Sequence, residues 1–178
     1  MKKYSLIALI VVFMSVMGFA QNGTSSLKVG YVNSETILNQ YPVAIKAQGE
    51  LDALVTLWQA QLDSMAQDLE AGIESYQKQA ATMPQAKKDE TQAQLVKKQQ
   101  DLENFRKVKF TPNTGEIYAE RAKLMRPIMD KVYAAIEAVS KEEGMQFVFD
   151  KATDAFLLYA DGAFDVTFKV LDRLKRGN

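Results

Sequence analysis

Carboxylates are the residues of this sequence whose type and spacing could support chemistry. Asp150, Asp154 and Asp161 could hold a hard cation such as Ca²⁺, and Glu142 with Glu143 could form an acid/base pair. The three aspartates flank expected turns, however, and a Ca²⁺ loop would bring more oxygen ligands at closer spacing. The two glutamates stand at the expected end of a helix, with no sign of a pocket. We therefore expect no metal site and no catalytic site.

The sequence contains no Cys and no His. Disulfides, thiol nucleophiles, imidazole bases and the commonest transition-metal ligands are therefore excluded. A phosphate-binding loop of the Walker type is also absent from the sequence. The 22 basic residues balance the 22 acidic ones, which does not suggest a binder of duplex nucleic acid. We expect a protein that is not an enzyme, needs no cofactor and binds no nucleic acid.

Lysines and methionines in the middle of the chain could instead bind another polypeptide. Residues 76–112 carry eight cations against four anions, whereas residues 44–74 carry one cation against six anions. Thioether side chains repack easily, which suits adaptable contacts. Each charge alone is equally well explained as part of a solvated helix face, and most methionines fall on a helical packing stripe. The residues that we expect to contact a bound polypeptide are Met83, Lys87, Lys88, Lys97 and Lys98.

The N-terminus has the features of a secretory signal peptide. Lys2 and Lys3 precede an apolar run at residues 4–20, which ends in a small-x-small cleavage pattern. We expect residues 1–20 to be removed on export and residues 21–26 to form a flexible, polar N-terminus. The alternative is a retained membrane anchor, for which the run is short. Gln21 rather than a cysteine follows the expected cleavage site, so a lipid anchor has no acceptor thiol.

Apolar residues recur every three or four positions through the central part of the chain, which predicts long helices. The pattern runs through residues 43–81, is interrupted by residues 82–84, and resumes until Gly144, a typical helix C-cap. A second interruption lies at residues 111–115. We expect residues 43–143 to form an antiparallel helical hairpin that projects as an arm, with its tip near residues 82–84.

The two ends of the mature chain have the composition of strands. Residues 27–32, 145–150 and 155–160 each predict a strand, the last two being joined by a turn, and residues 164–176 predict a final helix that caps the sheet. We expect residues 27–42 and 144–178 to form a small β-rich body. A body of this size is marginally stable alone, so we expect it to oligomerise. The predicted oligomer core comprises Val29, Tyr31, Val32, Phe147, Val148, Phe149, Leu157 and Tyr159.

Three separated segments resemble the Skp/OmpH family in the same order along the chain. They are residues 28–38, residues 142–151 and residues 157–171. The resemblance implies an α+β fold in which a long antiparallel α-helical hairpin stands on a small β-sheet body, and a jellyfish-like homotrimer. It also implies a periplasmic holdase chaperone, independent of ATP, that binds unfolded outer-membrane proteins. The sequence departs from the family pattern at Phe168 and Lys169, where an acidic pair often opens the last helix, and at residues 111–115.

Two further interpretations remain open. The basic segment would also suit contact with an anionic membrane surface. The chain could alternatively be a structural coiled coil that spaces or bridges components of the cell envelope. A spacer should keep its apolar heptads up to the tip, whereas residues 77–94 are rich in Gln and weakly apolar.

Overall fold

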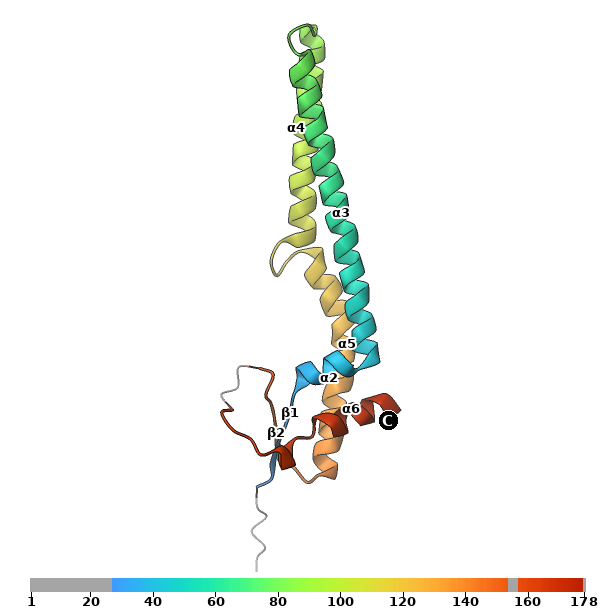
Figure 1. The fold of residues 1–178 in the computed structure, drawn as a ribbon, viewed down its shortest axis with the longest axis vertical. Helices are drawn as coiled ribbons and strands as arrows, with labels where there is room; N and C mark the ends of the chain where they lie inside the picture. The colour runs from blue at the N-terminus through green and yellow to red at the C-terminus, as the bar shows by residue number, and fades with distance from the viewer. Residues whose placement is uncertain (1–26, 154–156, 178) are drawn as a thin grey trace, which may run out of the picture.

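A long helical arm rises from a small base in the computed structural model, which describes residues 27–153 and 157–177 (Figure 1). The order of elements is β1 (Val29–Val32), α2 (Ser34–Gln40), α3 (Pro42–Gln79), α4 (Gln85–Phe110), α5 (Glu116–Glu142), β2 (Phe147–Asp150), η2 (Gly162–Phe164) and α6 (Thr167–Arg176). The predicted combination of a helical hairpin and a small sheet is confirmed.

Helix α3 forms one side of the arm, and α4 followed by α5 forms the other side (Figure 1). Pro42 is the first residue of α3, where its missing N–H costs no helical hydrogen bond. The 38 residues of α3 span about 57 Å at about 1.5 Å per residue. Its buried residues, such as Leu51, Trp58 and Leu62, follow the spacing of one helical stripe. The chain reverses between Gln79 and Gln85, with Pro84 directly before α4.

The side of the arm that returns to the base is interrupted where α4 ends and α5 begins. We call the connecting residues, Thr111 to Gly115, the elbow. Asn113 adopts a positive φ of 63° there, and Pro112 cannot continue the hydrogen-bond ladder of α4. Gly115 is buried, and a Cβ atom at this position would lie 2.7 Å from the carbonyl oxygen of Lys109. The elbow therefore requires glycine at its last position.

The sheet has two strands that run parallel, with Val29 paired to Phe147 and Val32 paired to Asp150. The predicted strand at residues 155–160 is wrong for residues 157–160, which have no strand structure, while residues 155 and 156 lie outside the described residues. The segment pairs neither with β1, whose two sides are taken by β2 and Asp165, nor with the outer edge of β2, which has no strand partner among the described residues. Tyr31 bridges to Asp165 on its other side, and its carbonyl accepts the N–H of Val166.

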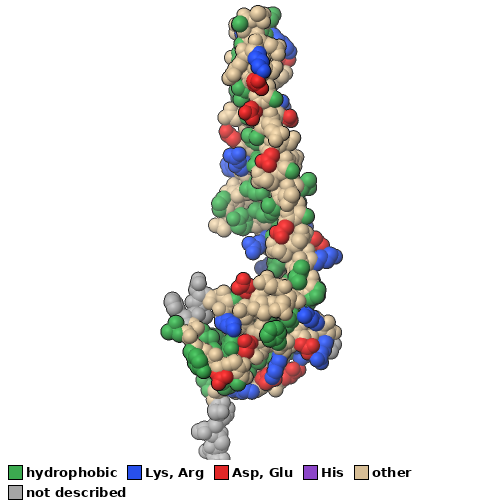
Figure 2. Space-filling model, in the orientation of Figure 1, with side chains coloured by type: hydrophobic (Ala, Val, Ile, Leu, Met, Phe, Trp, Pro, Cys, Tyr) green, Lys and Arg blue, Asp and Glu red, His purple; other side chains and the backbone are tan. Residues whose placement is uncertain are grey.

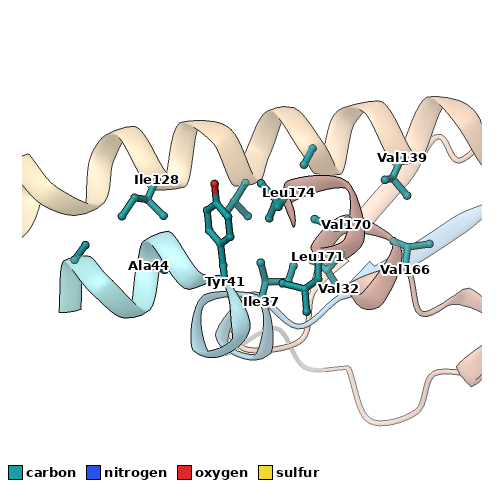
Figure 3. Close-up of a cluster of buried hydrophobic side chains, with 13 residues drawn as sticks. Val32, Ile37, Tyr41, Ala44, Ile128, Val139, Val166, Val170, Leu171 and Leu174 are labelled. Carbon is teal, nitrogen blue, oxygen red and sulfur yellow. The ribbon is translucent and has the colours of Figure 1, made fainter. Parts of the chain in front are cut away.

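The hydrophobic core joins the base to the lower end of the arm (Figure 3). Val32 of β1 and Ile37 of α2 pack with Val170 and Leu171 of α6. Tyr41, Val166 and Leu174 also belong to this core. The base of the arm contributes its other buried residues, which are Ala44, Ala47, Ile128, Val132, Ala135 and Val139. The base therefore shares its hydrophobic core with the lower end of the arm.

The body is also less rich in strand than expected, because helices α2 and α6 form much of it. Helix α6 begins at Thr167, three residues after the predicted start, since Phe164 lies in η2 and Val166 pairs with β1. It packs on α5 and α2, and its buried residues also share the core with Val32 of β1. Its strongly one-sided apolar pattern explains this contact: Val170, Leu171 and Leu174 are all buried.

Candidate functional site

The tip of the arm carries two of the residues predicted to contact a polypeptide, Met83 and Lys87. Met83 is half-buried, and its sulfur lies 3.9 Å from the hydroxyl oxygen of Thr91 on α4. Lys87 is exposed and forms an ion pair with Glu90 at 2.7 Å. Met83 is thus partly engaged in closing the hairpin, and the charge of Lys87 is partly balanced.

The other three predicted residues, Lys88, Lys97 and Lys98, lie along α4. Lys98 donates a hydrogen bond to the carbonyl oxygen of Asp68 on α3, over 3.4 Å. The ten-residue separation between Lys87 and Lys97 corresponds to about 15 Å of helix. The predicted residues therefore do not converge on one site but are spread along one helix.

The outer arm presents an excess of unbalanced positive charge. Of the eight cations in residues 76–112, Lys78, Lys87 and Lys109 form ion pairs with Glu74, Glu90 and Glu116. The remaining five make no ion pair within the part of the chain that the structure describes: Lys88, Lys97, Lys98, Arg106 and Lys107. Helix α4, on which all five lie, has no buried residue. Its charges are therefore accessible to a partner.

Sequence reasoning missed an aromatic cluster at the elbow. The rings of Trp58 on α3 and Phe110 on α4 meet edge to face, with centroids 6.2 Å apart and planes at 88°. The ammonium of Lys109 lies 4.5 Å from the centroid of Trp58 and 5.8 Å from that of Phe105. Figure 2 shows hydrophobic side chains gathered at this height of the arm.

Lys109 holds this cluster together through two kinds of contact. Its ammonium interacts with the negative faces of two aromatic rings, and it also pairs with Glu116 at the start of α5. It therefore links all three helices of the arm. The spacing of Phe105 and Lys109, one helical turn apart, is the sequence signal that could have indicated the contact.

Apolar side chains are exposed on the base beside the sheet. Phe147 and Phe149, alternate residues of β2, are 57% and 49% exposed, and Tyr159 is 82% exposed. Phe149, Leu157 and Tyr159 border a groove of about 320 Å³. Hydrophobic side chains are also visible on the base in Figure 2.

The other residues of the predicted oligomer core are less accessible. Val29 and Val148 are half-buried, and Tyr31 is buried beneath the side chain of Lys151, whose ammonium lies 4.9 Å from the ring centroid. Val32 is only 2% exposed and belongs to the core of its own chain. A second chain could not reach Val32, which differs from the expectation for this residue.

The aspartates considered as metal ligands serve the local structure instead. Asp150 accepts hydrogen bonds from the backbone N–H groups of Ser34 and Ala152, each over 3.0 Å, and Asp161 accepts one from Ala163. Burial would raise the pKa of Asp150, but the hydrogen bonds from Ser34 and Ala152 outweigh burial and hold the pKa below its ordinary value. Asp154 lies outside the described residues.

Asp165 has a similar role on the other side of the sheet. Burial would raise its pKa, but hydrogen bonds from Thr167 and the charge of Lys151 lower it below the ordinary value. Within residues 27–153 and 157–177, no three acidic side chains are grouped closely enough to hold a metal ion. None of the described helices has the length and apolar character needed to cross a membrane.

The profile of the family described as outer membrane protein (OmpH-like) matches residues 28–174, which include the arm and nearly all of the base. The chain belongs to the OmpH-like family. This family is the one indicated by the Skp/OmpH resemblance of the three sequence segments. OmpH-like proteins are periplasmic chaperones and not enzymes.

The OmpH-like fold is also found among solved structures. The chain resembles the crystal structure of a candidate OmpH-like outer membrane chaperone from Caulobacter crescentus, with a TM-score of 0.71 and 16% sequence identity. The likeness covers 88% of each chain. At this identity the similarity establishes the fold alone. A comparison with curated proteins gave no match.

Proposed function

We propose that the protein is an ATP-independent holdase of the periplasm, which binds unfolded outer-membrane proteins and prevents their aggregation. The observation that supports this most directly is α4, a helix of 26 residues with no buried side chain. The face of α4 that is turned away from α3 is available to a partner. A chaperone role is known at the level of the family, and the holdase activity of this chain is the step that we add.

The chemistry of the arm suits a client without a fixed structure. Strands of outer-membrane barrels alternate apolar and polar residues, so an unfolded barrel protein offers both kinds of contact along its length. The five unpaired cations of α4 can attract such a chain without fixing one pose. Met83 at the tip adds an adaptable apolar contact. Many weak contacts of this type hold a client and still release it.

We further propose that the protein acts as a homotrimer joined at the base. The support is the exposed aromatic surface beside β2, since contiguous apolar surface of this type marks an interaction site. Phe147, Phe149, Leu157 and Tyr159 are the proposed contacts, with Val29 and Val148 beneath them. Three arms would then surround a common cavity, as the family resemblance implies.

Export and membrane contact complete the proposal. The predicted signal peptide at residues 1–20 lies outside the described residues; it would direct export of the chain to the periplasm and be removed on export. The positive charge of the outer arm also suits transient contact with an anionic membrane surface, where clients arrive.

The test is dilution of a denatured outer-membrane barrel protein into buffer with and without the purified mature chain, in the absence of ATP. We expect light scattering to fall as the chain approaches stoichiometric amounts. An unrelated soluble coiled coil at the same concentration is the control. Equal scattering with both proteins would contradict the holdase and favour a structural spacer in the cell envelope.

A further inference from the structure

The elbow is the place on the arm where aromatic side chains of two helices lie together. We define the elbow patch as Trp58, Phe105, Val108, Phe110 and Tyr118, which come from α3, α4 and α5. Trp58 is buried beneath Phe110 and Lys109, while Val108 and Tyr118 are 46% and 40% exposed. We take the aromatic cluster as the floor of the patch, and Val108 and Tyr118, the exposed apolar residues nearest to Phe110 in the sequence, as its rim.

The backbone at the elbow explains why this surface is accessible. The interruption of the helix at Thr111 to Gly115 carries the chain outward from the arm, as Figure 1 shows between α4 and α5. An unbroken helix would pack its apolar residues along α3. Here the close approach of Gly115 to Lys109 fixes the path of the loop and holds Lys109 near the two rings.

The charges around the elbow patch indicate the net charge that a partner should carry. Residues 105–123 contain five cations and two anions. Both anions are already engaged, since Glu116 pairs with Lys109 and Glu120 pairs with Lys123 at 3.3 Å. The other three cations make no ion pair among the described residues: Arg106, Lys107 and Arg121. The apolar patch is therefore bordered by unbalanced positive charge.

We propose that the elbow patch holds an extended segment of unfolded polypeptide that is rich in aromatic residues and acidic overall. This proposal rests on the proposed holdase function and assigns its principal contact to the elbow instead of the tip. Aromatic side chains on one face of the segment pack against the rim and edges of the patch. Acidic side chains beside them meet Arg106, Lys107 and Arg121.

A pair of matched variants tests the proposal. The elbow variant combines Val108→Ser with Tyr118→Ser. The control variant combines Val96→Ser with Tyr133→Ser, which makes the same two changes on the same two helices, at side chains that are 53% and 62% exposed. Val96 lies about 18 Å along α4 from Val108 at about 1.5 Å per residue. Circular dichroism first establishes that both variants fold.

The probe is a tryptophan-free, fluorescently labelled peptide with the repeat Tyr-Ser-Asp-Ser, which places Tyr and Asp on the same face of an extended chain. It is titrated with each protein and followed by anisotropy. We expect the elbow variant to bind it about ten-fold more weakly than the wild type, and the control variant to bind within about two-fold. A second peptide, with Lys in place of Asp, should bind the wild type at least about ten-fold more weakly. Equal affinities of the two variants, or of the two peptides, would overturn the proposal.

Trp58 provides a readout that needs no variant, because it is the only tryptophan of the chain. Unlabelled acidic peptide should shift or quench its emission in the wild-type protein, whereas a contact at the tip would leave it unchanged. An unchanged emission in a protein that does suppress aggregation would overturn the elbow site and leave the holdase standing. A wild-type protein that neither suppresses aggregation nor binds the peptide would contradict both the elbow site and the holdase function.

Discussion

Gly115 is the residue on which the shape of the elbow depends most directly. A Cβ atom there would lie 2.7 Å from the carbonyl oxygen of Lys109 and from the backbone nitrogen of Thr111, and backbone atoms cannot rotate away. We expect Gly115→Ala to lower the free energy of unfolding by about 1 to 3 kcal/mol. Urea unfolding followed by circular dichroism, at one fixed protein concentration, measures the change.

The matched control for this change is Gly49→Ala in the interior of α3. A Cβ atom at Gly49 meets nothing within 4 Å, so alanine should raise the free energy of unfolding by roughly 0.5 to 1 kcal/mol. If Gly115→Ala lowers the free energy of unfolding and Gly49→Ala raises it, the effect at Gly115 comes from the close backbone contact and not from the helix propensity of alanine. A Gly115→Ala protein as stable as the wild type would mean that the elbow tolerates another path.

Asp150 should make the stability of the base depend on pH. Its folded pKa lies below its unfolded value of about 3.9, so its contribution is complete above that value. The contribution is lost as the pH falls through the folded pKa. Asp150→Asn keeps the acceptor oxygen but cannot ionise, so wild type and variant should differ in unfolding midpoint at pH 7 and converge as the pH falls below the folded pKa of Asp150. A difference that stays constant with pH would contradict this assignment.

At the scale of single elements, the contribution of the positive charge of α4 to client capture can be measured without changing the shape of the helix. We expect reversal of Lys87, Lys88, Lys97 and Lys98 to Glu to slow the capture of an acidic unfolded client and to flatten its dependence on salt. Exposed charges are worth about 0 to 1 kcal/mol each in an ion pair, so stability should change little. Stopped-flow capture at low and high salt gives the rates.

Changing the same four lysines to Gln provides the control for this charge reversal, because it removes charge and keeps a polar side chain. Its capture rate at low salt should lie between those of the wild type and the reversed protein. Wild-type rates for the reversed protein in both salts would mean that these lysines are only a solvated face of the helix. Client contact would then depend on the apolar surface of the arm.

The helices of the arm could be predicted because their signals are local. Apolar spacing, Pro42, Pro84 and Gly144 act within a few residues of where they stand, and they locate the long hairpin. The aromatic cluster at the elbow could not be predicted in the same way. It depends on which turn of α3 faces which turn of α4, and this alignment brings Trp58 beside Lys109. Periodicity places a residue on a face but does not fix its partner.

The strands were harder to predict because a short apolar segment becomes a strand only if it pairs with another strand. Residues 157–160 have the composition of a strand, but they pair neither with β1, which lies between β2 and Asp165, nor with the outer edge of β2. The core of the base was also misjudged, since Ala44, Ala47 and Val132 belong to helices that the sequence assigns to the arm. Their part in the core follows from tertiary packing alone.

At the scale of the whole molecule, the proposed trimer can be tested through its exposed aromatic surface. Phe149 is half exposed in the single chain, so Phe149→Asp should leave the fold of one chain largely intact but place a charge in the proposed contact. Native mass spectrometry should detect trimers of the wild type and smaller species of the variant. A stable monomeric wild type at micromolar concentration would contradict the trimer.

A corresponding change on the arm controls for general effects of added charge. Val96→Asp lies on exposed α4, outside the proposed contact, and should leave the mass distribution of the wild type unchanged. If the Phe149→Asp and Val96→Asp proteins both dissociate into smaller species, the assembly does not depend on the base alone.

The parallel pairing of β1 with β2 also constrains how the chain acquires its structure. Lys28 and Gln146, which exchange hydrogen bonds beside this pairing, are 118 positions apart in the sequence. A chain delivered from its N-terminus must therefore leave β1 without its partner until nearly all of the protein has emerged. If the hairpin zips together first, it brings the two ends close and shortens the effective loop that must be closed. In that order of events the long arm would guide folding as well as carry the proposed binding surface, and its rate of formation would limit how long the apolar residues of β1 remain uncovered.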